Sequence, residues 1–84
     1  MERAGFNERK LEILSFVGSG LRTSMEVAGA CAISQSCASA LLSRYWRQGL
    51  LRRYTDSMWN LKVYTLSEKG LDRLEWLMRE FEVF

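Results

Sequence analysis

The segment Glu26–Leu51, EVAGACAISQSCASALLSRYWRQGLL, constrains the fold of this chain more than any other segment. It predicts two short helices joined by a tight turn, with Ser24 capping the first helix and Ser34 capping the second. Gly49 follows where a left-handed backbone is least costly for glycine, so we expect the second helix to end at about Gln48. The segment therefore predicts a pair of helices in close succession.

Two further helices are expected on either side of this pair. One runs from about Asn7, its N-cap, to Val17, and the other from Glu68 to about Glu82 with Ser67 as its cap. Apolar residues recur in all four helices every three or four positions, which predicts buried stripes. The stripes are Leu11, Ile13, Leu14, Phe16 and Val17; Val27, Ala28 and Cys31; Cys37 or Ala38 with Leu41, Leu42 and Tyr45; and Leu71, Leu74, Met78 and Phe81, flanked by Leu77 and Phe84.

A β-hairpin is expected between the second helix of the pair and the last helix. Its strands are Leu50–Thr55 and Leu61–Leu66, and its tip is the turn-rich stretch Asp56–Asn60. A large apolar side chain is unexpected at such a tip, yet Trp59 is there. We favour a Trp59 that folds back over the hairpin or the preceding helix; the alternative is that it presses into a minor groove or against a partner.

The order helix, short strand, helix, helix, two-stranded hairpin, helix resembles the winged helix-turn-helix. This fold belongs to the α+β class, is mostly α, and would occupy residues 1–84 as a single domain. The hairpin is its wing and the second helix of the pair is its recognition helix. The residues that carry the resemblance are Ala28 in the first helix of the pair, Ile33 in the turn, Ser34-Gln35-Ser36 at the start of the recognition helix, and Leu41 and Tyr45, which anchor that helix in the core.

Two further motifs narrow the resemblance. Gly49-Leu50 is similar to the Gly-Leu pair that leads into the wing of MarR-like regulators, and Tyr64-x-Leu66-Ser67-x-Lys69-Gly70 resembles their Tyr-x-Leu-Thr-x-Lys-Gly signature. The chain also resembles small archaeal winged-helix proteins that dimerise through a C-terminal helix, here residues 68–84. It departs from the pattern at Ala32, where the turn usually has Gly, and at Ala38, where Val or Ile is usual.

Basic residues are concentrated where such a fold would contact DNA. Positions 34–66 carry five basic residues against Asp56 alone, although the whole chain has a net charge of only +2. A local excess of this kind is the footprint of a surface that binds phosphates. A merely solvated basic face is the alternative reading of the same charges.

The resemblance implies double-stranded DNA binding as a homodimer, sequence-tolerant to moderately specific, by a transcriptional regulator located in the cytoplasm on the nucleoid. The alternative is a protein–protein interaction module within a larger complex. Groove entry by the recognition helix gives the base readers, the basic residues give the phosphate contacts, and the apolar surface of the last helix gives the dimer interface. Base readers are Gln35, Ser36, Ser39, Ala40 and Ser43; phosphate contacts are Arg22, Arg44, Arg47, Arg52, Arg53 and Lys62; the dimer interface is Leu71, Leu74, Trp76, Leu77, Met78, Phe81 and Phe84.

Other functional classes lack support in the sequence. The chain has no His, no Gly-rich phosphate loop and no nucleophile beside an evident base, so we do not expect an enzyme. Cys31 and Cys37 are too few to ligate a structural metal, and both are expected to be small buried residues, with a disulfide as the alternative. No cofactor, no small-molecule effector and no membrane association are expected, since no apolar run approaches the roughly 18 residues of a span.

Overall fold

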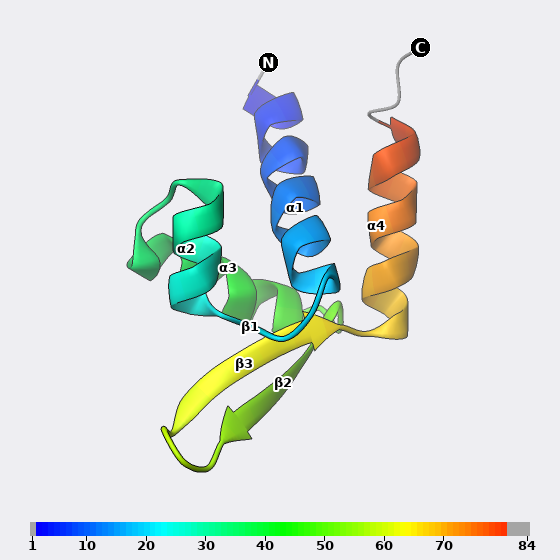
Figure 1. Cartoon of the computed structure of the whole chain (residues 1–84). Helices are drawn as coiled ribbons and strands as arrows, with labels where there is room; N and C mark the ends of the chain where they lie inside the picture. The colour runs from blue at the N-terminus through cyan, green and yellow to red at the C-terminus, as the bar shows by residue number, and fades with distance from the viewer. Residues whose placement is uncertain (1, 81–84) are drawn as a thin grey trace.

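The structure is a computed structural model that describes the backbone of residues 2–80 and the side chains of residues 7–80. Helices α1 and α4 stand side by side, and a β-hairpin projects away from them (Figure 1). This order of elements confirms the prediction. The elements are α1 (Glu2–Gly18), β1 (Arg22–Thr23), α2 (Ser24–Cys31), α3 (Gln35–Arg47), β2 (Leu51–Asp56), β3 (Leu61–Leu66) and α4 (Glu68–Glu80).

The sheet has three antiparallel strands in the order β1-β3-β2. Strand β3 is central: Leu66 pairs with Leu51 of β2, and Tyr64 pairs with both Arg53 of β2 and Arg22 of β1. The long β2–β3 hairpin is the wing, and the two-residue β1 ties its inner strand to the segment between α1 and α2.

The core lies where α1, α2, α3 and the start of the wing meet. Ile13, Leu14 and Val17 of α1 are fully buried, as the spacing of its apolar residues predicts. α3 contributes Tyr45, the largest fully buried side chain. The other members of the core are Val27, Cys31, Ala38, Leu42, Leu50, Leu51, Tyr64, Leu74 and Leu77.

Helix α1 is longer than predicted. It begins at Glu2, so Asn7 lies inside the helix and is not its N-cap. The prediction rested on residue type alone, whereas Glu2, Arg3 and Ala4 are good helix formers that extend the helix toward the N-terminus.

Helix α2 is capped by Thr23 and not by Ser24, which is its first residue. The Thr23 hydroxyl accepts a hydrogen bond from the backbone N–H of Glu26 (3.2 Å), and the Glu26 carboxylate accepts one from the backbone N–H of Thr23 (2.9 Å). This reciprocal capping box satisfies two backbone N–H donors at once. Ser24 cannot form such a box, because the residue three positions later is not Glu or Gln. It also fixes the helix start beside β1.

The turn and the ends of α3 agree with the prediction, apart from a difference of one residue at the C-terminus. Ala32 has a left-handed backbone (φ 57°), and the Ser34 hydroxyl accepts a hydrogen bond from the N–H of Cys37 at 3.0 Å. Beyond Arg47, Gly49 takes φ 83°, the conformation that favours glycine. Strand β2 then begins at Leu51, one residue later than expected, because the Leu50 N–H still bonds to the carbonyl of Tyr45 (2.9 Å).

The wing is joined to α4 through a compact set of contacts that we call the wing base: Gly49, Leu50, Ser67 and Gly70. The Ser67 hydroxyl donates to the carbonyl of Gly49 (2.6 Å) and accepts from the N–H of Gly70 (3.0 Å). The Ser67 N–H donates to the carbonyl of Leu50 (3.0 Å). Ser67 therefore caps α4, as predicted, and also fastens it to the entrance of the wing.

The buried face of α4 differs from the predicted stripe. Gly70, Leu74 and Leu77 face the core, while Leu71 and Met78 are about half exposed (48% and 54%). A Cβ on Gly70 would overlap the carbonyl oxygen of Leu50, so only glycine allows this approach. The contact turns α4 away from the face that apolar spacing suggested.

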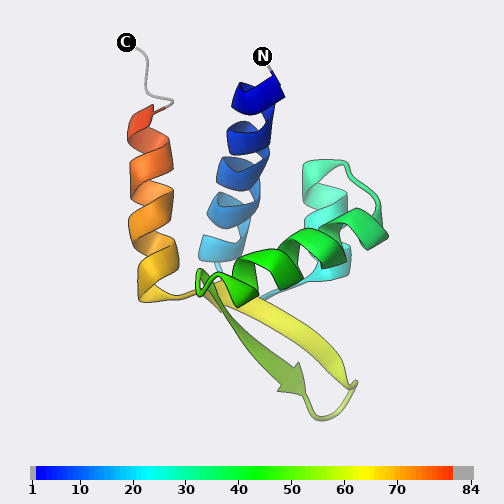
Figure 2. The ribbon, with the colours of Figure 1, turned by 180° about the vertical axis from the view of Figure 1, so that it is seen from behind.

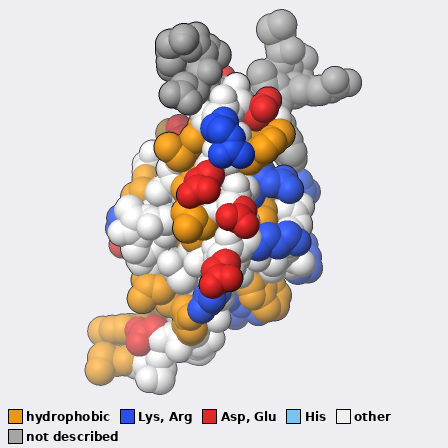
Figure 3. Space-filling view, turned by 90° about the vertical axis from the view of Figure 1, so that its right-hand side faces the viewer, with side chains coloured by type: hydrophobic (Ala, Val, Ile, Leu, Met, Phe, Trp, Pro, Cys, Tyr) orange, Lys and Arg blue, Asp and Glu red, His pale blue; other side chains and the backbone are white. Residues whose placement is uncertain are grey.

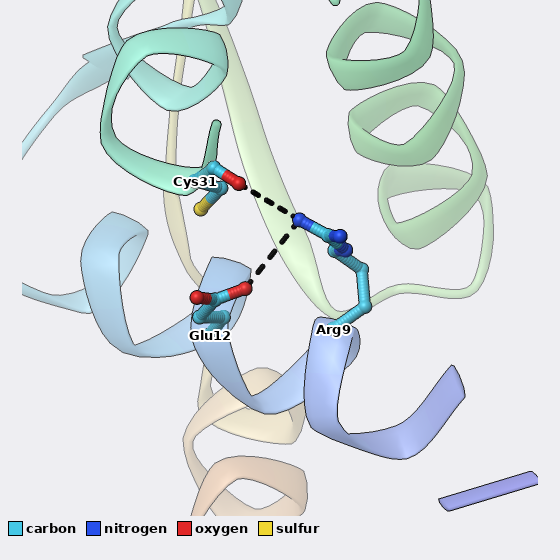
Figure 4. Close-up of polar contacts among 3 residues, drawn as sticks. All are labelled: Arg9, Glu12 and Cys31. Atoms are coloured by element: carbon cyan, nitrogen blue, oxygen red, sulfur yellow. Dashed lines mark hydrogen bonds and ion pairs between the residues drawn. The ribbon is translucent and has the colours of Figure 1, made fainter. Parts of the chain in front are cut away.

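One polar contact joins α1 to the end of α2 (Figure 4). The guanidinium of Arg9 donates to the backbone carbonyl of Cys31 (2.9 Å) and reaches the Glu12 carboxylate at 3.5 Å. A helix leaves its last carbonyls without partners, so Arg9 satisfies one of them for α2. The contact between Arg9 and Glu12 lies within α1, between residues three apart.

Candidate nucleic-acid interface

Helix α3 lies across the foot of α1 and above the wing (Figure 2). Ala38, Leu42 and Tyr45 fix its rotation by facing the core. Gln35, Ser39 and Ser43 recur every four residues along the flank beside this buried face, and the other predicted base readers, Ser36 and Ala40, lie opposite it. Of these, Gln35, Ser36, Ser39 and Ala40 are exposed, and Ser43 is half-buried.

A groove of about 270 Å³ runs between this face of α3, the start of α2 and the wing. It brings together three predicted base readers, Gln35, Ser39 and Ser43, while Ser36 and Ala40 lie outside its lining. An open groove whose walls carry hydrogen-bonding side chains and cations can contact the base edges and phosphates of a nucleic acid. The remaining lining residues are Thr23, Ser24, Met25, Arg53, Leu61, Lys62 and Tyr64.

The predicted phosphate contacts fall into two groups on the wing. Side chains alternate along a strand, so Arg52 points to the opposite sheet face from Arg53. Arg53 and Lys62 line the groove, and Arg52 is exposed on the far face. Sequence reasoning treated the two arginines as a pair, but the structure places only one of them beside α3.

Arg53 is held in place by an aromatic ring. Its guanidinium lies 3.5 Å from the centroid of the Trp46 ring, which belongs to the last turn of α3. Stacking of this kind positions an arginine at little entropic cost. Trp46 is 37% exposed, so it lies off the buried stripe of α3. The stacking of Arg53 on Trp46 was not predicted, because it joins a strand to a helix.

Arg22 is occupied elsewhere. Its Nε donates to the carbonyl of Phe16 (3.3 Å) and its Nη2 to the hydroxyl of Ser19 (2.7 Å). The guanidinium also lies 4.2 Å from the centroid of the Phe16 ring. The structure therefore ties Arg22 to the α1–β1 loop and does not bring it to the groove.

Arg44 and Arg47 are exposed near the end of α3. Among the described residues, Arg9 and Glu12 form the one ion pair. No described carboxylate therefore forms an ion pair with Arg44, Arg47, Arg52 or Lys62. Their charges remain available to an external anion.

The wing tip, residues 57–60, contradicts the favoured prediction for Trp59. Trp59 and its neighbour Met58 are 70% and 79% exposed, so neither folds back over the molecule. The turn is closed by its own backbone: the N–H of Asn60 bonds to the carbonyl of Asp56 (2.7 Å), and Asn60 takes a left-handed φ of 54°. A closed turn leaves both apolar side chains pointing away from the protein.

The predicted dimer interface is divided by the rotation of α4. Leu74 and Leu77 belong to the core of the protomer, whereas Leu71, Trp76 and Met78 are exposed. Phe81 and Phe84 lie outside the described residues. The exposed apolar part of α4 is therefore smaller than the sequence suggested.

Both cysteines are free thiols, and they differ in exposure. Cys31 is buried, and burial is the main cause that raises the pKa of its thiol, so it is a poor nucleophile. Cys37 is exposed on the first turn of α3, contrary to the prediction. No group of three metal-ligating side chains occurs among the residues that the structure describes.

No single helix in the described part of the chain is both long and apolar enough to cross a membrane. Taken together, α2 and α3 reach that length and apolar content, but the two helices meet at a bend of 113°.

No protein family model and no curated protein matches this chain. Several solved structures, a transcriptional regulator among them, share its fold. BldR from Sulfolobus solfataricus has a TM-score of 0.78 at 22% identity, over 86% of this chain and 52% of its own. Reduced HlyU from Vibrio cholerae has a TM-score of 0.71 at 28% identity, over 96% and 84%.

A third similar structure is the homodimeric winged helix-turn-helix DNA-binding domain of Mb0332 from Mycobacterium bovis, a possible ArsR-family regulator. It has a TM-score of 0.71 at 25% identity, over 94% of this chain and 71% of that one. The chain spans little more than half of BldR, at 52% of its length. These likenesses confirm the winged helix-turn-helix fold.

Proposed function

We propose that this protein binds double-stranded DNA by placing α3 in the major groove. The observation that carries the proposal is the groove in which Gln35, Ser39 and Ser43 of α3 face Arg53 and Lys62 of the wing. Hydrogen-bonding side chains on the first half of a recognition helix reach base edges, and flanking cations reach phosphates. Two structural neighbours, the transcriptional regulator BldR and the DNA-binding domain of Mb0332, support a binding role in preference to catalysis.

Within this proposal, Gln35 is the strongest candidate for direct readout, because its amide can make a paired contact to adenine. Ser36, Ser39 and Ser43 are permissive, and Ala40 offers only a methyl contact to thymine. The set predicts moderate specificity, with much of the affinity coming from Arg44, Arg47, Arg52, Arg53 and Lys62. Arg22 is left out, since two of its donors bond to the Phe16 carbonyl and the Ser19 hydroxyl and it does not line the groove.

The wing tip is the second contact that we propose. Met58 and Trp59 are exposed at the end of a hairpin whose strands carry Arg52 and Lys62. Apolar side chains at such places act as wedges against base steps in the minor groove. Trp59 would then add affinity without reading base edges, most of all at base steps that unstack easily.

We further propose a homodimer assembled on α4. Leu71 and Met78 are exposed apolar side chains seven residues apart on one face of that helix. Trp76 is exposed on another face, and one structural neighbour is a homodimeric DNA-binding domain. Light scattering at tens of micromolar, an order-of-magnitude working concentration, should give twice the protomer mass. Leu71→Glu with Met78→Glu should give the protomer mass, and a monomeric wild type would refute the dimer.

The DNA proposal is tested by titrating labelled duplexes of random and genomic sequence with the protein at two salt concentrations. Binding should weaken steeply with salt, and Lys62→Ala should flatten the logarithmic salt slope by about one unit. Arg79→Ala, which removes the same charge from α4 outside the groove, is the matched control and should leave the slope unchanged.

Gln35→Ala separates readout from positioning. It should cost about 1–3 kcal/mol on a favoured site and little on random duplex. Equal weakening on both would make Gln35 a positioning residue only.

Failure of the wild type to bind any duplex at low salt would refute the DNA proposal and leave the protein-interaction alternative. Location on the nucleoid and a role in transcription follow from the same proposal and depend on the same titration.

A further inference from the structure

Lys10 of α1 is a charged side chain that the fold buries. It is only 8% exposed, and its ammonium lies 5.3 Å from the centroid of the Tyr45 ring. Lysine is almost never buried to this extent unless an opposite charge pairs with it. Among the described residues, no carboxylate forms an ion pair with Lys10. The described part of the fold thus covers most of this side chain without providing a carboxylate partner for its ammonium.

Lys10 opens onto a surface hollow of about 520 Å³ whose other walls are also basic. Three cations from distant parts of the sequence line it with Lys10: Arg47 at the end of α3, and Lys69 and Arg73 on α4. Gln48 and Leu50 complete the lining, so no described carboxylate faces the hollow. Four positive charges from three helices therefore share one concave site.

The wing base leaves room for this arrangement. A Cβ added to Gly49 would lie within 3.7 Å of the Lys69 ammonium, so that side chain runs close over the glycine. In the view onto α4, Lys and Arg side chains gather along one edge of the face, beside a row of acidic side chains on the helix itself (Figure 3). Acidic residues of α4 are thus near, but they do not line the hollow.

Crowding of like charges has a physical consequence for Lys10. Burial lowers the pKa of Lys10, and the neighbouring Arg73 and Arg44 lower it further. Each cation destabilises the others in the free protein, and a bound anion would reverse the sign of that interaction. Arginine forks and a lysine point charge together suit phosphate, which accepts several charge-assisted hydrogen bonds at once.

We propose that the hollow formed by Lys10, Arg47, Lys69 and Arg73 binds a small polyphosphate-type anion. It shares no lining residue with the groove between α3 and the wing. Arg47 alone belongs both to the hollow and to the proposed phosphate contacts of the duplex. Arg47 and the wing base belong to the elements that place α3 and the wing. An anion that pulls these cations together would therefore act on the geometry of the groove. The proposal does not depend on DNA binding.

Inorganic pyrophosphate is the probe for this proposal, titrated into the full chain at low salt by calorimetry. At about 100 times its Kd, pyrophosphate should raise the midpoint of thermal unfolding by about 10 °C. The side-chain NMR signals of Lys10 should shift in the same titration. Arg73→Gln, which changes an exposed side chain, should weaken binding at least about tenfold. Lys10→Met, which keeps the side chain long but removes its charge, should also weaken binding at least about tenfold.

The matched control is Arg52→Gln, which removes one arginine charge from the far face of the wing. Its pyrophosphate affinity should equal that of the wild type. The proposal is overturned if pyrophosphate does not bind at low salt, or if Arg52→Gln weakens it as much as Arg73→Gln does. It is also overturned if Arg73→Gln weakens duplex binding while free pyrophosphate has no effect, because the phosphate would then belong to DNA.

Discussion

At its base the wing is fastened to two helices, whereas at its tip no described residue from outside the wing holds it. Ser67 bonds to Gly49 and Leu50, and Gly70 packs directly on the Leu50 carbonyl. Trp59, by contrast, is 70% exposed. The base therefore sets the direction of the hairpin, and the tip is free to meet a partner. Substitutions should accordingly change stability at the base and binding at the tip.

The largest effect is expected for Gly70→Ala. The added methyl would overlap the Leu50 carbonyl oxygen, so α4 or the wing entrance has to move, and we expect a loss of about 3 kcal/mol in the free energy of unfolding. Denaturant titration measures this. Gly29→Ala is the matched control: its Cβ meets nothing within 4 Å in α2, and it should gain about 0.5–1 kcal/mol. A Gly70→Ala variant as stable as the wild type would contradict the tight base.

The second effect concerns alkaline pH. Tyr45, whose carbonyl receives the Leu50 N–H, has its hydroxyl pKa raised to about 12, mainly by burial. Below pH 10 the tyrosine is protonated in both states and nothing changes. Between about pH 10 and 12 the unfolded chain loses this proton first, so folding should lose about 2–3 kcal/mol across that window.

Tyr45→Phe should remove this part of the decline, and Tyr54→Phe, at a half-exposed position on β2, should not. Urea titrations of the three proteins at a series of pH values provide the comparison. Parallel pH profiles for the wild type and Tyr45→Phe would show that the ring does not ionise within the folded core.

A smaller effect is expected for Ser67→Ala. The variant loses the cap of α4 and the bond to the Gly49 carbonyl, which together should cost about 1 kcal/mol. Ser57→Ala, in the exposed wing tip, should be neutral. The two variants compare the base and the tip of the wing directly. Equal unfolding midpoints would show that the base contributes no more to stability than the tip does.

The smallest change in stability is expected for Trp59→Ser, within about 0.5 kcal/mol, since exposed side chains contribute little. Its duplex affinity should nevertheless fall several-fold if the tip is a minor-groove wedge. The binding isotherms of Trp59→Ser and the wild type on one duplex settle this. Unchanged affinity would remove the wing tip from the proposed interface without affecting α3.

Local chemistry explains what the sequence predicted well. Ser34 and Ser67 were identified as caps because the bonds of an N-cap join residues three apart, and the Gly49 turn follows from its own backbone preference. Thr23 was missed in favour of Ser24, although Glu26 lies at the position that completes a capping box with Thr23. That signal was present in the sequence.

Contacts between distant residues explain what the sequence could not show. The rotation of α4 depends on Gly70 meeting the Leu50 carbonyl, and the aim of Arg53 depends on the ring of Trp46. Neither pair has a periodic signature. The cations around Lys10 come from α1, α3 and α4, so no run of basic residues in the sequence predicts the cluster. The groove residues Gln35 and Ser39 were predictable because one helix carries both.

The two-residue strand β1 has a consequence for the order of folding. The β2–β3 hairpin and the α2–α3 pair are local in sequence and can form within microseconds, whereas pairing Arg22 with Tyr64 closes a long loop. We therefore expect β1 to dock last. Since the neighbouring residues Thr23 and Ser24 form one wall of the groove, that wall is completed only in the final step. The amides of β1 should exchange their hydrogens from a partly open state in which the helices are intact and the groove is absent.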